Sequence, residues 1–128
     1  MLSPSRLKRN LEKEEKRMAR NEAHDQNMSR VARELGTALK HETANKWGAV
    51  RMQVREEDRR HAWRFRSDSD GSQRFLRVTH KAMSQSDNPV PMLIEQLQAG
   101  RWLDRLQGGP ETSLVLFKDG RLEARARS

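Results

Sequence analysis

The chain of 128 residues contains no cysteine and no tyrosine. Without cysteine it has no disulfide framework, no thiolate ligand for a metal and no cysteine nucleophile, an absence that suits a reducing compartment. Long apolar runs are missing as well, because the richest stretch, residues 90–97, is broken by Pro91, Glu95 and Gln96. No segment resembles a signal peptide or a membrane span, so we expect a cytoplasmic protein without a membrane partner.

Basic charge is what the chain has in excess. Lysine and arginine number 26 against 18 for aspartate and glutamate, which gives a net charge of +8 and a pI near 10.8. Such a protein attracts polyanions, for example nucleic acid or anionic lipid. Hydrophobic residues make up only 34% of the chain, so part of it is not expected to join a core.

Composition divides the chain near residue 23. Residues 1–23 hold few large apolar side chains among a dense mixture of charges. Since so thin an apolar face buries little surface, we predict a mobile basic arm or a frayed helix there. Residues 24–128 are expected to form a single domain, which is the number that a chain of this length normally contains.

Two segments have the periodicity of helices. The first starts near Asp25 or Asn27 and is expected to end between His41 and Lys46, and its apolar stripe consists of Met28, Val31, Ala32, Leu35, Ala38 and Leu39. Gly36 weakens this helix but permits close packing on a sheet. The second starts around Pro89, ends at Gly100 and is followed by a short helical turn that contains Trp102, Leu103 and Leu106.

Other segments alternate apolar and polar residues with a period of two, which is typical of half-buried strands. Three of them, around residues 50–55, 63–66 and 75–78, are joined by polar loops and predict an antiparallel meander. Residues 112–127 predict a hairpin, because the turn sequence KDG separates two strand-like runs. The expected fold is therefore α+β: an N-terminal helix, the meander, a helix and the hairpin, with the helices packed on one face of an antiparallel sheet. The strand with which the hairpin pairs stays open.

The alternation also separates the two faces of the sheet, since successive side chains of a strand point to opposite sides. The core side is expected to hold Val50, Met52, Val54, Trp63, Phe65, Leu76, Val78, Leu122, Ala124 and Ala126. The outer side is expected to hold Arg51, Gln53, Arg55, Arg64, Arg66, Phe75, Arg77, Arg121, Glu123, Arg125 and Arg127. An ordinary solvated face is one interpretation. The other is an anion-binding face, because like charges opposite each other across strands destabilise a sheet unless an anion shares them.

Arginine suits phosphate because its planar guanidinium donates paired hydrogen bonds and stacks on bases. We therefore predict a non-catalytic nucleic-acid-binding protein with little sequence preference, for DNA or RNA, with single strands favoured. The predicted phosphate contacts are Arg51, Arg55, Arg64, Arg66, Arg77, Arg121 and Arg125 on the sheet, and Lys8, Arg9, Lys13 and Arg17 on the arm. Phe75 is predicted to be exposed among these arginines and to stack on a base.

Two alternatives stay open. One is an adaptor or chaperone that docks on an acidic protein, or forms a homodimer through the stripe of the first helix. The other is a structural subunit of a phage or ribonucleoprotein particle, in which the arm is a tether that orders on binding.

The residues favour neither catalysis, nor a cofactor, nor a metal. The four histidines lack the spacing of metal ligands on one helix; they are His24, His41, His61 and His80. The carboxylates at 56–58 adjoin two arginines and indicate a charged turn, and no serine has the context of a nucleophile elbow. The tryptophans Trp47, Trp63 and Trp102 are interpreted as core anchors.

Three family resemblances are limited to topology or to a short run. The order helix, three strands, helix resembles double-stranded-RNA-binding domains, without their basic helix start around Asp87–Ile94. The same order with two further strands resembles class I type III secretion chaperones, which are typically acidic. The run GSQRFLRV is similar to one strand of the Pur-alpha family of single-strand binders over about eight residues. None of them assigns the chain to a family.

Overall fold

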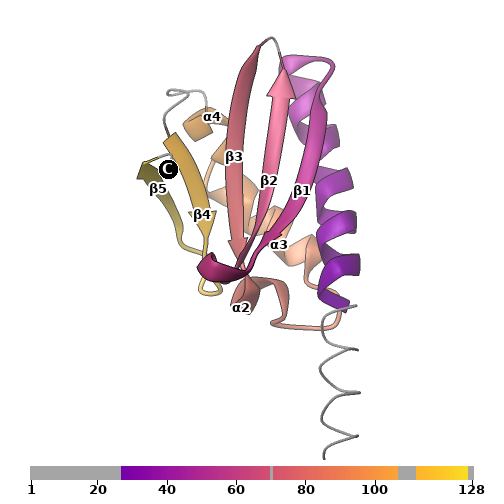
Figure 1. The fold of residues 1–128 in the computed structure, drawn as a ribbon, viewed down its shortest axis with the longest axis vertical. Helices are drawn as coiled ribbons and strands as arrows, with labels where there is room; N and C mark the ends of the chain where they lie inside the picture. The colour runs from indigo at the N-terminus through magenta and orange to yellow at the C-terminus, as the bar shows by residue number, and fades with distance from the viewer. Residues whose placement is uncertain (1–26, 70, 107–111, 127–128) are drawn as a thin grey trace, which may run out of the picture.

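The computed structural model describes residues 27–69, 71–106 and 112–126, which form an α+β fold with helices and a five-stranded mixed sheet (Figure 1). The predicted arm, with Lys8, Arg9, Lys13 and Arg17, lies outside the described residues, as does Arg127. The elements are a helix over residues 27–47, β1 (Arg51–Glu57), η1 (Asp58–Arg60), β2 (Ala62–Ser69), β3 (Ser72–Thr79), α2 (His80–Met83), α3 (Val90–Ala99), α4 (Trp102–Leu106), β4 (Thr112–Leu116) and β5 (Leu122–Ala126).

The sheet has the strand order β1-β2-β3-β4-β5. The pairs β1–β2 and β2–β3 are antiparallel, as predicted for the meander, and so is the β4–β5 hairpin. The prediction of a wholly antiparallel sheet is wrong, because β4 pairs with β3 in parallel. Parallel neighbours need a crossover connection, and here α2, α3 and α4 provide it.

The helices lie on one side of the sheet, behind it in the view of Figure 1. The stripe of the long helix is buried against this face together with Leu93 and Leu97 of α3 and Trp102 of α4. From the sheet the core receives Phe65, Leu76, Val78, Leu114 and Leu116. Because the stripe packs on the protein's own sheet, it is not available as the dimer interface that one alternative required.

The long helix continues to residue 47, beyond the predicted end. Trp47, the one residue beyond that limit, packs against the core, and the Arg74 guanidinium lies 4.0 Å from its ring centroid. The small size of Gly36 has the predicted effect: a Cβ there would lie 2.7 Å from Val54 Cγ2. The helix therefore approaches β1 more closely than an alanine would allow.

Candidate nucleic-acid interface

The strand registers determine which side chains share the face that the helices leave uncovered, since cross-strand partners point to the same side. Across β1, β2 and β3, Arg55 is paired with Arg64 and Arg64 with Arg77. We call this side the open face and define it by its strand residues Arg51, Gln53, Arg55, Glu57, Arg64, Arg66, Asp68, Phe75, Arg77, Glu123 and Arg125. The division of the two sheet faces that the alternation predicted is therefore present for these residues.

Two carboxylates on the open face were not expected. Glu57 and Asp68 had been assigned to polar loops, but β1 continues to Glu57 and β2 to Ser69. Asp68 Oδ2 lies 3.1 Å from Arg66 Nη2, and Glu57 Oε1 accepts a hydrogen bond of 2.6 Å from Arg77 Nε. The open face is thus less one-sided in charge than the sequence indicated.

Arg77 is buried, with an exposed fraction of 5%. Besides its bond to Glu57 it donates from Nη1 to Ser113 Oγ at 3.1 Å. A guanidinium with both partners inside the sheet does not reach a phosphate in solvent, so the predicted phosphate contact at Arg77 does not fit the structure.

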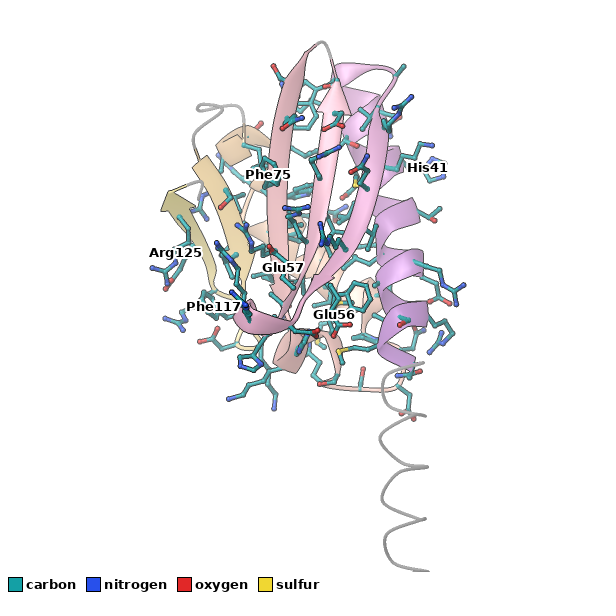
Figure 2. The ribbon with its side chains drawn as sticks, viewed as in Figure 1. His41, Glu56, Glu57, Phe75, Phe117 and Arg125 are labelled. Carbon is teal, nitrogen blue, oxygen red and sulfur yellow. The ribbon has the colours of Figure 1, made fainter. Side chains whose placement is uncertain are left out.

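Phe75 is also buried, with an exposed fraction of 6%, so the prediction that it stands exposed is wrong. It lies on β3, the central strand, between Arg66 on β2 and Ser113 on β4 (Figure 2). The Arg64 guanidinium lies 5.6 Å from its ring centroid. Strands on both sides and a long side chain across the ring cover it, and a base would first have to displace Arg64.

Accessible arginines lie at both edges of the open face, and they differ in whether a carboxylate compensates them. Arg51 and Arg55 are exposed and Arg64 is half-buried. None of the three forms an ion pair with a carboxylate in the described part of the chain. At the opposite edge, Arg125 and Arg121 both pair with Glu123, at 2.6 and 3.0 Å, so their charge is partly compensated.

The pairing of Arg55 with Arg64 and of Arg64 with Arg77 opposes like charges across neighbouring strands, which costs stability. Glu57 compensates Arg77, and the Phe75 ring receives Arg64. Arg55 has neither kind of partner among the described residues. An anion placed over Arg55 and Arg64 would remove the remaining repulsion.

No group of three or more histidines, aspartates and glutamates that could hold a metal ion occurs within residues 27–69, 71–106 and 112–126. His24 lies outside this part of the chain. Among the described helices none is both long and apolar enough to cross a membrane. Trp102 is buried in the core, and Trp47 and Trp63 pack against it, as the sequence indicated.

No protein-family model, curated protein or solved structure matches the chain. The three resemblances noted in the sequence therefore receive no support.

Proposed function

We propose that the protein is a non-catalytic nucleic-acid-binding protein that holds the phosphate backbone on its open face with little sequence preference. The observation that carries the proposal is the set of accessible arginines without carboxylate partners: Arg55 and Arg64, opposite each other on β1 and β2, and Arg51, four residues before Arg55 on β1. Arg66 lies on β2 opposite Gln53, between the positions of Arg51 and Arg55, and Arg125 lies on β5 at the other edge of the sheet. Both already pair with an acid, as does Arg121 just before β5. To bind a phosphate, each of these arginines would first have to give up its carboxylate partner.

Arginine spacing supports a backbone ligand rather than a single anion. Neighbouring strands lie about 4.8 Å apart, which is the separation of Arg55 from Arg64, whereas Arg51 and Arg55 are four residues and about 13 Å apart on β1. The three arginines thus extend over more than one phosphate group, so Arg51 can engage a different phosphate of one strand than Arg55 and Arg64 do. Such contacts carry no base information, which is why we expect little sequence preference.

The first test is fluorescence anisotropy of a labelled oligothymidylate with the double variant Arg51→Glu and Arg55→Glu. Both side chains are exposed, so the exchange should leave the fold intact. A matched control is Arg33→Glu with Lys40→Glu, which makes the same change of charge at two exposed positions of the long helix. We expect the face variant to lose affinity by about tenfold or more and the control by about twofold, since only the former removes phosphate contacts.

An equal loss in the two variants would contradict the proposal, because binding would then follow net charge alone. Competition with polyglutamate distinguishes the nucleic-acid-binding proposal from the alternative of an adaptor for an acidic protein. If polyglutamate displaces the oligonucleotide at the same concentration of charges, the open face recognises acidic protein as readily as phosphate, and the adaptor becomes the better conclusion.

A further inference from the structure

A cavity of about 600 Å³ lies at the end of the open face, where η1 and the start of α2 meet the turn between β4 and β5. Its size falls within the usual range of small-ligand pockets, about 300–1,000 Å³. Thr79, one of its lining residues, is the open-face partner of Ala62, and this pair follows the pair Arg64–Arg77 along β2 and β3. The cavity is therefore continuous with the face proposed to bind nucleic acid.

One wall of the cavity depends on an unusual backbone. His61 has a φ of 50°, in the left-handed region that residues other than glycine seldom adopt. Its N–H donates to the Asp58 carbonyl at 3.1 Å, and its carbonyl accepts from the His80 N–H at 2.7 Å. These bonds hold the two imidazole rings edge to face, with centroids 6.2 Å apart. The strained conformation thus places two flat rings beside the cavity.

Phe117, which follows β4 and is only partly buried, also lines the cavity. In Figure 2 it lies near the lower end of the sheet, below Phe75. Its N–H donates to the Arg121 carbonyl at 2.9 Å, and the Arg121 guanidinium carbon lies 4.9 Å from its ring centroid. Phe117 is less buried than Phe75 and lines a cavity, where a base would share its ring with the Arg121 guanidinium or displace it.

Basic side chains surround these rings. Arg60, Lys81, Lys118 and Arg121 contribute to the lining, against one acid, Asp119. The Asp119 carboxylate is occupied by Arg121, whose Nε lies 2.8 Å from Oδ2. Lys81 and Lys118 are exposed, and neither forms an ion pair within the described residues. The cavity therefore combines aromatic walls with an excess of positive charge.

We propose that this cavity holds one nucleobase of a single strand that lies along the open face. The base stacks on Phe117, and Lys81 and Lys118 contact the phosphates next to it. This inference rests on the proposed function and extends it, because it adds a preference for unpaired bases to a backbone interface. A strand is favoured over a free nucleotide because the cavity is continuous with the arginine-bearing rows of the sheet.

The test compares three labelled probes in anisotropy measurements: oligothymidylate, an oligonucleotide of equal length composed of abasic sites, and a duplex of that length. The wild-type chain should bind thymidylate more tightly than the abasic strand by about fivefold to a hundredfold, the range that stacking of one base supplies. Phe117→Leu should remove this preference and leave binding of the abasic strand within about twofold of wild type. Phe117→Trp should restore the preference, since indole stacks as well as phenyl.

The outcomes separate this inference from the proposed function. If wild type and Phe117→Leu discriminate equally between thymidylate and abasic strands, or if Phe117→Leu weakens both equally, the base pocket is wrong, while the Arg51 and Arg55 variant still tests the open face. Thymidine monophosphate that binds as tightly as the oligothymidylate would overturn the choice of a strand as ligand.

The lysines have a matched test. Lys81→Ala with Lys118→Ala should weaken the binding of thymidylate and abasic strands alike. It should also reduce the salt slope, the fall of the logarithm of affinity with the logarithm of salt concentration, by about 0.7 for each lost phosphate contact. Arg33→Ala with Lys40→Ala removes the same charge from the exposed side of the long helix and should leave the slope unchanged. Equal slopes for the two variants would contradict a role for Lys81 and Lys118 in holding phosphate.

Discussion

At the scale of single residues, Arg77 is the costliest charge to leave without a partner, because it is 5% exposed and depends on Glu57 and Ser113. We predict that Glu57→Gln lowers the free energy of unfolding by about 3 kcal/mol, since it leaves a buried guanidinium without a counter-charge. The combination Glu57→Leu with Arg77→Met removes both charges and should recover much of the loss. Urea denaturation measures both.

Glu123→Gln is the control for that experiment. Glu123 pairs with Arg121 and Arg125, both of which are more than half exposed, and exposed pairs contribute about 0–1 kcal/mol. Equal destabilisation by Glu57→Gln and Glu123→Gln would show that the Arg77 pair has no special weight.

A second residue-scale prediction concerns Asp104. Lys46 Nζ donates a hydrogen bond of 2.5 Å to Asp104 Oδ1, and this bond, together with the lysine's charge, lowers the pKa of Asp104 from its ordinary value of 3.8. A lowered pKa in the folded state means that the interaction contributes stability above pH 3.8, and that this stability is lost as the pH falls through the folded value. Lys46→Gln should raise the pKa of Asp104 toward 3.8 in a titration of the carboxyl carbon followed by NMR, and an unchanged titration would contradict the assignment.

At the scale of elements, the contact between the long helix and β1 depends on the absence of a side chain at Gly36. A Cβ there would lie 2.7 Å from Val54 Cγ2, so Gly36→Ala must displace Val54 or the helix. The gain in helix propensity is about 1 kcal/mol, whereas overpacking costs about 1–3 kcal/mol. We expect a net destabilisation of about 1 kcal/mol, measured by thermal or urea unfolding. In the Val54→Ala background the same exchange should be neutral or stabilising, and additive effects would contradict the close contact.

The elements themselves could be predicted from the sequence because burial of one face imposes a period that the chain displays directly. The stripe from Met28 to Leu39 and the alternation around Val50–Val54 are local signals, and both correspond to observed elements. The parallel pairing of β4 with β3 is not local, since it depends on where the crossover through α3 returns the chain. Polar residues near strand ends gave no signal, which is why Glu57 was assigned to a turn.

The candidate site, too, could be predicted from the sequence only in part. Alternation predicted that Arg51, Arg55 and Arg64 share the open face. It could not predict that Phe75 is covered, because burial there depends on which strands flank β3. The aromatic residue that does line a cavity, Phe117, precedes the turn Lys118–Gly120 and carried only the signal of an aromatic at a strand end beside basic residues. The cavity at Phe117 is formed with η1 and α2, which the chain brings to the hairpin from far away in sequence.

At the scale of the whole molecule, the net charge of +8 makes the affinity for any polyanion depend on salt concentration. We expect the basic residues of the first 23 positions to contribute to this salt dependence, and the cavity to provide the preference for a base. For single strands the logarithm of affinity should fall with the logarithm of salt concentration by about 0.7 per neutralised phosphate. Exchanging Lys8, Arg9, Lys13 and Arg17 for glutamine should reduce that slope and the affinity at low salt. The preference for thymidylate over the abasic strand should persist, since stacking on Phe117 releases no counterions. If the preference instead disappears with the basic residues of the first 23 positions, base recognition belongs to that segment and not to the cavity.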